Sequence, residues 1–271
     1  MLRCPLLLLA LSLMGTGVYA QTRTAPPPQP KIGQAGKDVV WVPTPDVLVE
    51  KMLDLAMVTA QDYLIDLGSG DGRTVIAAAK RGTRAHGIEY NRDMVALSRQ
   101  AAATQRLSDR ATFAEADLFR SDFSDATVLT LFLLPEINMQ LRPKILALKP
   151  GTRVVSNTFT MQDWEPDESV TVADCQVYCT AHFWIVPAQV EGTWRFAGGE
   201  FSLTQQFQRI RGALLSGANS APITNARLRG DQIAFTAAGV RYSGRVDGDT
   251  MQGTLSSQES LGSWRATRTS R

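Results

Sequence analysis

Three closely spaced glycines restrict the fold of this chain more than any other feature. Gly68, Gly70 and Gly72 follow an apolar run at 63–67 and precede an alanine-rich segment at 73–81. Glycine adopts positive φ angles readily and lets a ligand approach the backbone closely. The pattern therefore predicts a strand, a tight turn and a helix, which is the setting that glycine-rich ligand-binding motifs require.

Strand-like and helix-like runs alternate on both sides of this turn. Strands are expected at 85–89, 112–116, 127–134 and 152–157, and helices at 46–58, 92–106 and 136–148. Such alternation predicts an α/β, Rossmann-like fold, in which a parallel sheet carries helices on both faces. Two later runs, 170–173 and 178–186, are expected to close the sheet as an antiparallel pair.

The last part of the chain differs in composition and in sequence pattern. Residues 188–271 contain arginine but no lysine, many glycines and no helical periodicity. Segments 226–235 and 243–252 both alternate around a Gly-Asp turn, which indicates repeated β-hairpins. We expect a small antiparallel β-meander or half-barrel, with Trp194 and Trp264 in its core.

The first residues have the pattern of a secretory signal peptide. Arg3 precedes a short apolar run, and small residues at Val18 and Ala20 favour cleavage after Ala20. The run is shorter than the about 20 residues that cross a membrane, and an uncleaved anchor is the alternative. We therefore predict export to the periplasm or envelope. The expected parts are a signal peptide at 1–20, a proline-rich linker at 21–38, the α/β domain at 39–187 and the all-β module at 188–271.

The few cysteines and histidines limit which disulfides and metal sites the chain can form. Export permits a disulfide between Cys175 and Cys179, and two buried free thiols are the alternative. A metal site is not expected, because the chain has 2 histidines, and neither His86 nor His182 stands at ligand spacing from both cysteines.

The charge distribution bears on possible partners. The net charge of +2 gives no reason to expect a nucleic acid. Residues 188–271 hold 10 arginines and 6 acidic residues, a difference of +4. A face with this excess could contact an anionic envelope surface, and a solvated face is the alternative.

Three acidic residues stand at the ends of three expected strands. Asp66, Glu89 and Asp117 would meet in one crevice, because open α/β sheets bind ligands at the carboxyl ends of their strands. Glu89 lies where a carboxylate accepts hydrogen bonds from ribose hydroxyls, and Asp117 is placed to accept one from an adenine amino group. Three unrelated surface acids are the alternative.

The glycine spacing narrows the choice of ligand. It is G-x-G-x-G, whereas sites that hold a pyrophosphate have G-x-G-x-x-G. S-adenosylmethionine is a nucleoside with no phosphate, and it fits the expected crevice.

These blocks resemble the class I (seven-strand) S-adenosylmethionine-dependent methyltransferases. The wider pattern is similar to the non-SET histone-lysine methyltransferases, and closer still to the mitochondrial-type protein-lysine methyltransferases. It consists of the blocks 42–45, 66–73, 133–138, 141–144 and 151–156. The resemblance covers about 40–186 and leaves the β region outside.

The resemblance implies a site for S-adenosyl-L-methionine without a metal. Its expected residues are Thr44, Asp66, Gly68, Ser69, Gly70, Gly72, Glu89, Tyr90, Asp117 and Leu118. Thr44, the expected N-cap of the first helix, and Pro43 belong to a loop that would close over the cosubstrate. Glu136 and Asn138 are the expected catalytic residues facing the methyl group, with Glu136 accepting from or orienting the amine. The alternative for Glu136 is an acid favoured by the helix dipole.

The function that this pattern favours is methyl transfer to a lysine of a protein substrate. A small-molecule methyltransferase and an aminopropyl transferase are alternatives with the same fold. The absence of an Asn/Asp-Pro-Pro-Tyr motif counts against nucleobase amino groups. A non-catalytic exported binding protein is a further alternative, because export would separate the chain from a cosubstrate that is made in the cytosol.

Overall fold

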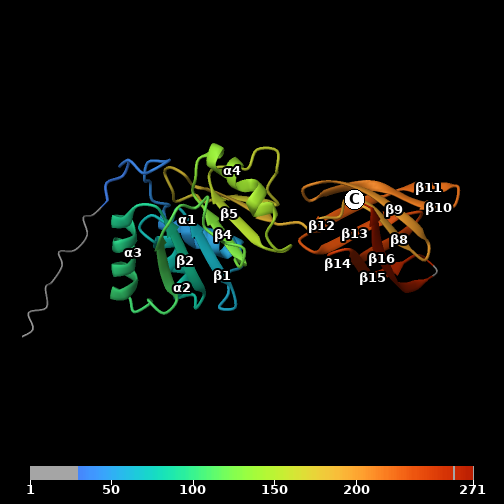
Figure 1. Ribbon diagram of the computed structural model, residues 1–271, viewed down its shortest axis with the longest axis horizontal. Coiled ribbons are helices and arrows are strands. Elements are labelled where there is room, and N and C mark those ends of the chain that lie inside the picture. Colours follow the sequence, from blue (N-terminus) through green and yellow to red (C-terminus); the bar gives the residue numbers. More distant parts are fainter. Residues whose placement is uncertain (1–29, 259, 271) are drawn as a thin grey trace, which may run out of the picture.

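The computed structural model describes residues 30–258 and 260–270. Figure 1 shows an α/β domain and a β domain side by side along the long axis of the molecule. The predicted signal peptide at 1–20 lies outside the described residues, as does the predicted linker up to residue 29. Within the described ranges, no helix is long and apolar enough to cross a membrane.

The described residues of the α/β domain form a seven-stranded sheet, in which β3, β2, β1, β4 and β5 are parallel and β7 is antiparallel to both of its neighbours. In spatial order its strands are β3 (Ala111–Glu115), β2 (Arg84–Glu89), β1 (Tyr63–Leu67), β4 (Val128–Leu131), β5 (Arg153–Asn157), β7 (Thr180–Ile185) and β6 (Glu168–Thr171). The strand order reverses between β1 and β4, which is where open α/β sheets bind their ligands. The predicted Rossmann-like sheet and its antiparallel closing pair are confirmed.

Helices cover both faces of this sheet. The buried side chains of α1 (Asp46–Leu55), α2 (Arg73–Lys80) and α3 (Arg92–Thr104) belong to one apolar core. Those of α4 (Pro135–Leu146) belong to a second core on the other face. Each helix buries an apolar stripe against the sheet, which is how amphipathic helices are held in α/β domains.

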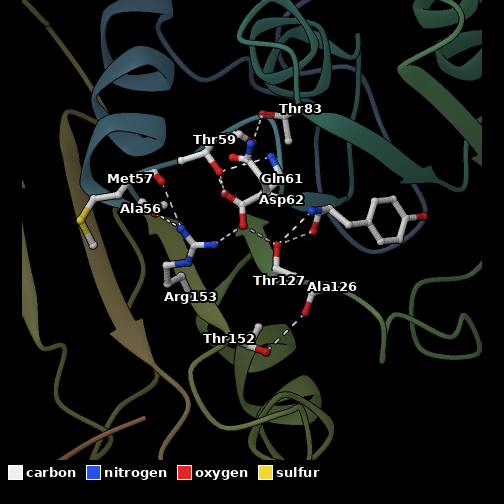
Figure 2. Close-up of polar contacts among 11 residues, drawn as sticks. Ala56, Met57, Thr59, Gln61, Asp62, Thr83, Ala126, Thr127, Thr152 and Arg153 are labelled. Carbon is white, nitrogen blue, oxygen red and sulfur yellow. Dashed lines mark hydrogen bonds and ion pairs between the residues drawn. The ribbon is translucent and has the colours of Figure 1, made fainter. Parts of the chain in front are cut away.

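A buried ion pair ties the chain together at the opposite end of the sheet from the strands' carboxyl ends. The Arg153 guanidinium contacts the Asp62 carboxylate and donates a hydrogen bond of 2.7 Å to the Ala56 carbonyl (Figure 2). Asp62 also accepts from the Thr127 hydroxyl at 2.8 Å and from the Thr59 backbone N–H at 2.8 Å. These bonds fix the turn between α1 and β1 against Thr127, which directly precedes β4, and against Arg153, the first residue of β5.

The β domain is a nine-stranded antiparallel sheet within the described residues, in the order β11-β10-β9-β8-β16-β15-β14-β13-β12. It consists of two meanders joined by the pairing of β8 with β16. The strands are β8 (Gly192–Phe196), β9 (Gly199–Gln206), β10 (Arg209–Ser216), β11 (Asn219–Pro222), β12 (Thr224–Arg229), β13 (Gln232–Ala237), β14 (Val240–Asp247), β15 (Thr250–Ser256) and β16 (Leu261–Ser270).

This sheet is nearly closed. Its two ends approach each other, since the Ile223 N–H donates to the Gly212 carbonyl at 2.9 Å. Trp194 and Trp264 are both buried in its core. The half-barrel, both hairpins and both core tryptophans predicted from the sequence are confirmed.

The two domains meet through an aromatic contact. Phe207, in the turn between β9 and β10, stacks on Trp164 with ring centroids 5.8 Å apart. The Arg142 guanidinium lies 5.2 Å from the centre of the same Phe207 ring. The Gln208 side chain donates to the Glu165 carbonyl at 2.8 Å. The β domain therefore packs directly on the face of the α/β domain that carries α4.

Candidate functional site

A pocket lies at the carboxyl ends of β1, β2 and β4, where the strand order reverses. The glycine turn forms one side of it and the segment 34–44 forms another. The predicted site residues that line it are Thr44, Asp66, Gly68, Ser69, Gly70, Glu89, Tyr90 and Leu118. Those that are not among its described lining residues are Gly72, Asp117, Glu136 and Asn138.

The glycine turn needs glycine for two physical reasons. Gly68, Gly70 and Gly72 have φ angles of 75°, 52° and 79°, and residues that carry a side chain rarely adopt such values. In addition, a Cβ at Gly70 would lie 2.7 Å from Nε1 of Trp41. Gly72 is not among the described residues that line the pocket, and a Cβ there would lie 2.7 Å from the Phe113 ring. Gly72 is the N-cap of α2, and its role in binding the ligand stays a prediction.

Glu89 holds the glycine turn from the end of β2. Its Oε2 accepts from the Gly70 N–H at 2.9 Å, and its Oε1 accepts from the Asn91 N–H at 2.8 Å. A carboxylate has about four acceptor positions, so this group can hold the turn and still accept hydrogen bonds from a ligand's hydroxyl groups. Glu89 lines the pocket, and its role as the ribose acceptor stays a prediction.

Asp66 is a buried acid that faces the same pocket. The Thr130 hydroxyl donates to its Oδ1 at 2.6 Å. Burial raises the pKa of Asp66 to about 7, and the charges of Asp71 and Glu89 add to this effect, while the Thr130 hydrogen bond opposes it. The pocket therefore holds a carboxyl group that gains its charge near neutral pH, and a cationic ligand would favour the charged form.

Asp117 stands beside the pocket and is paired with a lysine. Lys37 Nζ donates to its Oδ2 at 2.9 Å and also lies 4.9 Å from the centre of the Tyr90 ring. The hydrogen bond from Lys37, followed by that from the Phe119 N–H, holds the pKa of Asp117 below its ordinary value. The amine of Lys37 thus donates to the oxygen that was expected to accept from an adenine amino group.

Lys37 belongs to a stretch that was expected to be an extended linker. The Gly33 N–H donates to the Trp41 carbonyl at 2.8 Å, and the Trp41 N–H donates to the Gln34 carbonyl at 2.9 Å. The described part of this stretch, from residue 30 onward, therefore folds back on itself and covers the pocket. For this stretch, the sequence predicted only that the α/β domain begins at residue 39.

Thr44 lies in the loop that was expected to close over the cosubstrate. Its hydroxyl accepts from Asn157 Nδ2 at 3.2 Å, and its carbonyl accepts from Arg73 Nη1 at 2.9 Å. The expectation that Thr44 caps α1 is wrong, because the N-cap is Pro45 and no side chain caps the helix. The Thr44 hydroxyl instead ties this loop to the end of β5.

Glu136 and Asn138 are not among the described residues that line the pocket. Pro135 begins α4, and successive helix residues point about 100° apart, so Ile137 lines the pocket while its two neighbours point elsewhere. Glu136 is exposed. Asn138 is buried and its Nδ2 donates to the Phe159 carbonyl at 3.4 Å. A catalytic role for either residue stays a prediction.

Several residues at the pocket were not anticipated from the sequence. They include Trp41, Lys37, Met94 and Phe132, which all line it. Phe132 was assigned to a strand, but β4 ends at Leu131 and Phe132 lies in the loop that follows. Among the residues that the structure describes, no cluster of histidine, cysteine or acidic side chains could hold a metal ion.

Comparisons with known proteins identify this chain as similar to methyltransferases. A family model described as the ANTKMT methyltransferase domain matches residues 66–168. A protein-lysine N-methyltransferase from Saccharolobus islandicus is 38% identical over 151 residues, which cover 55% of this chain and 94% of that protein. The adenine nucleotide translocase lysine N-methyltransferase of Mus musculus is 38% identical over 105 residues. That match covers 38% of this chain and 46% of the mouse protein, so the chain spans less than half of this relative.

A solved structure adds evidence on the ligand. The crystal structure of an RNA methyltransferase from Salinibacter ruber in complex with S-adenosyl-L-homocysteine is 44% identical to this chain, with a TM-score of 0.52. The match covers 55% of this chain and 96% of that one. S-adenosyl-L-homocysteine is what remains of S-adenosylmethionine after the methyl group has been transferred.

Proposed function

The chain belongs to the class I S-adenosylmethionine-dependent methyltransferases with an ANTKMT-type methyltransferase domain, and from this premise we propose that it methylates the side-chain amine of a lysine in a protein. S-adenosylmethionine is its cosubstrate. The lysine acceptor is supported by the relative from Saccharolobus islandicus, of which the chain covers 94% at 38% identity.

The observation that carries the proposal is the pocket between β1 and β4. Its polar groups are Asp66 in β1, Glu89 at the end of β2 and the turn at Gly70 between β1 and α2, where they suit the cosubstrate. The side formed after β4 is apolar, with Phe132 and Leu133. An apolar pocket side suits the aliphatic side chain of a lysine. Apolar surroundings also lower the pKa of its amine and so favour the neutral, nucleophilic form.

The chemistry requires little of the protein beyond placement. The amine nitrogen attacks the methyl carbon in line with the sulfur, the N–C bond forms as the S–C bond breaks, and S-adenosyl-L-homocysteine leaves. Holding two reactants in line contributes several kcal/mol to such a reaction, roughly 7–11 in favourable cases. The lysine must lose a proton before it attacks. Glu136, exposed at the first turn of α4, stays our predicted acceptor or orienter of the amine.

The test combines cosubstrate binding with identification of the methylated product. We expect titration calorimetry to show binding of S-adenosylmethionine to the full chain, and Glu89→Ala to weaken it strongly. As a matched control, Asp122→Ala changes an acid outside the pocket and leaves binding unchanged. Labelled methyl groups incorporated from the cosubstrate into total cell protein should be recovered as methyl-lysine after hydrolysis.

RNA is the competing acceptor, because the Salinibacter ruber relative is an RNA methyltransferase. The net charge of +2 gives little support for a polyanionic substrate. Treating the labelled products with ribonuclease or protease separates the two cases. Label that ribonuclease releases would reject the lysine proposal, and so would label that appears only in small molecules.

We also propose that the chain acts outside the cytosol. The signal-like pattern at 1–20 motivates this, and the disulfide between Cys175 and Cys179, with Cα atoms 5.6 Å apart, supports it. Disulfides persist mainly in oxidising compartments. A fusion of the full chain to a reporter that is active only outside the cytosol should give signal, and a silent fusion would reject the proposal.

The β domain supplies a candidate surface for envelope contact. Strand register places Arg229, Gln232, Arg245, Gln252 and Arg265 in one row across β12–β16. Neighbouring strands lie about 4.8 Å apart, so the three arginines are about 10 Å apart. Together with the exposed Arg227, this row forms what we call the arginine face. We propose that the arginine face binds anionic lipid headgroups.

A further inference from the structure

Three aromatic side chains meet next to the pocket, and one of them, Phe132, lines its apolar side. Phe132 follows β4, Phe159 follows β5, and Tyr178 lies in the loop between β6 and β7. The Phe132 and Tyr178 rings meet edge to face with centroids 5.1 Å apart, and the Phe132 and Phe159 rings stack at 6.1 Å. The Phe159 and Tyr178 rings lie 6.3 Å apart. We call these three residues the aromatic cluster.

The aromatic cluster connects the pocket with the outside of the protein. Phe132 lines the pocket itself. Phe132 and Phe159 are half-buried, whereas Tyr178 is 39% exposed. A molecule that approaches the methyl group from the side of β4 and β5 would therefore run along aromatic surface before it reaches the cosubstrate.

A disulfide closes the loop that carries Tyr178. Cys175 and Cys179 are bonded across a sequence separation of 4, and the Val172 N–H donates to the Cys179 carbonyl at 3.0 Å at the base of the loop. Tyr178 has a φ of 57°, in the left-handed region that bulky residues rarely adopt. Such a conformation persists where the surroundings hold it in place, and the adjacent disulfide is the constraint closest to Tyr178.

Phe159 is held by a different constraint. The buried Asn138 donates through its Nδ2 to the carbonyls of Phe159 and Thr160, at 3.4 and 3.3 Å. The Thr158 N–H donates to the Thr180 carbonyl at 2.7 Å, which ties the same turn to β7. Two members of the cluster are thus positioned by contacts outside the pocket, which is how preorganised binding surfaces are built.

We propose that the aromatic cluster binds the aliphatic side chain of the acceptor amine, and that the Cys175–Cys179 disulfide sets the position of Tyr178 for this purpose. The inference rests on the proposed function, because it assigns a place to the amine that is methylated. The butyl chain of a lysine packs against the rings, and its ammonium group is attracted to their faces before it loses its proton. Tyr178 and the disulfide act on acceptor binding and leave the cosubstrate side untouched.

A lysine side-chain mimic tests this directly. The full chain is saturated with S-adenosyl-L-homocysteine and titrated with n-butylammonium, followed by saturation-transfer NMR. The neutral analogue 1-butanol measures the part of the binding that needs no charge. We expect n-butylammonium to bind more tightly than 1-butanol, and Tyr178→Ala to weaken it by about 3- to 10-fold, which corresponds to one cation–aromatic contact.

Matched variants separate the contribution of the Tyr178 ring to n-butylammonium binding from that of the loop that carries it. Tyr178→Phe keeps the ring and should bind n-butylammonium like the unchanged chain. Val177→Ala changes an exposed neighbour in the same loop and should have no effect. The double variant Cys175→Ser/Cys179→Ser should lower n-butylammonium affinity as Tyr178→Ala does. All variants should bind S-adenosyl-L-homocysteine within about twofold of the unchanged chain, which confirms that they are folded.

The outcomes distinguish this proposal from the proposed function. If the methyl-lysine assay succeeds but Tyr178→Ala and the double cysteine variant change neither n-butylammonium affinity nor the KM for the methylated protein, the aromatic cluster is not the acceptor site. If no methyl-lysine forms while n-butylammonium binding follows the expected pattern, the lysine proposal fails and an amine-binding site stands. Equal binding of n-butylammonium by all variants overturns the inference in either case.

Discussion

At the scale of a single residue, we expect Asp66 to couple ligand binding to pH. Its carboxyl group is buried in the pocket and has a pKa of about 7. S-adenosylmethionine carries positive charge on its amino group and its sulfur, and an ionised Asp66 attracts both. The folded chain without ligand keeps a proton on Asp66 at slightly acidic pH, and binding must release that proton.

The affinity for S-adenosylmethionine should therefore rise with pH. With a pKa of about 7 in the free protein, the dissociation constant should fall by about tenfold between pH 6 and pH 8, because one proton is lost on binding. Calorimetry in two buffers of different ionisation enthalpy would count the released proton. Asp66→Asn should weaken binding and remove the pH dependence, and an affinity that is flat with pH in the unchanged chain would contradict the mechanism.

Gly70 allows a second residue-level test. Alanine at this position must adopt a φ of 52° and place its Cβ 2.7 Å from Trp41 Nε1. Gly248→Ala is a matched control, because Gly248 has a φ of 56° and nothing within 4 Å of the added Cβ. Both changes should cost about 1–2 kcal/mol of stability for the left-handed backbone.

Only Gly70→Ala should also weaken S-adenosyl-L-homocysteine binding, by tenfold or more, because Trp41 must move out of the pocket side that it forms. Urea unfolding and calorimetry on the two variants measure both effects. Equal ligand affinity for the two variants would show that the contact between Gly70 and Trp41 has no part in the site.

Single residues also show what the sequence could and could not reveal. The glycines were predictable because a strand, a turn and a helix follow one another directly in the sequence, and Glu89 was predictable because it ends the next strand. The partner of Asp117 was not, because Lys37 lies 80 residues away and follows a proline-rich stretch with no helix or strand pattern. Contacts of that kind depend on how a loop folds over the sheet, and local periodicity carries no information on it.

At the scale of elements, small shifts in boundaries changed which side chains reach the pocket. The predicted strand at 127–134 is observed as β4 at Val128–Leu131, so that Phe132 enters the loop and lines the pocket. The apolar sequence after Leu131 resembles a strand, because apolar residues occur both in buried strands and in other buried segments. The type and order of the elements were predictable from periodicity, and the positions of Phe132, Glu136 and Asn138 depended on where β4 ends and α4 begins.

The Asp62–Arg153 pair joins elements and should be sensitive to both mutation and acid. Both side chains are largely buried, with exposed fractions of 8% and 18%. Arg153→Met leaves the Asp62 carboxylate buried without its cation, and we expect a loss of about 3–5 kcal/mol in the free energy of unfolding. Arg81→Met is the control, because its partners Glu50 and Asp54 are more than half exposed and such pairs contribute about 1 kcal/mol or less.

The pH dependence of that loss has a definite sign. Burial by itself raises the pKa of Asp62, but hydrogen bonds from Thr59 and Thr127 and the pair with Arg153 outweigh it and bring the pKa below its ordinary 3.8. A depressed pKa adds stability that is complete above the unfolded value and is lost as pH falls through the folded one. Urea unfolding at pH 7 and near pH 3 should show a smaller difference between Arg153→Met and the unchanged chain in acid, and an equal difference would contradict this assignment.

At the scale of the whole molecule, the β domain is fixed to the catalytic domain rather than tethered to it. Phe207 stacks on Trp164, and the Arg142 guanidinium lies over the same Phe207 ring. The Ala188 N–H donates to the Gly230 carbonyl at 2.8 Å beside the connection between the domains. Because the two parts are packed together, any surface that the β domain binds will hold the pocket at a set orientation to that surface.

The arginine face should then control where the enzyme works. We expect the full chain to bind vesicles that contain phosphatidylglycerol and not vesicles of phosphatidylcholine alone. A basic residue near an anionic surface contributes about 1 kcal/mol, so the triple variant Arg227→Gln/Arg229→Gln/Arg265→Gln should bind the anionic vesicles about 100-fold more weakly. Binding should also weaken as salt is added, because salt screens exposed charges.

A second triple variant tests whether vesicle binding depends on where the arginines lie or on the net charge of the chain. Arg92→Gln/Arg106→Gln/Arg110→Gln removes the same number of charges from exposed positions at and after α3. It should keep its affinity for anionic vesicles if the arginine face is the contact, and neither triple variant should change calorimetric binding of S-adenosyl-L-homocysteine. Equal losses of vesicle binding in both triple variants would show that attraction depends on overall charge, and the row across β12–β16 would then be a solvated face.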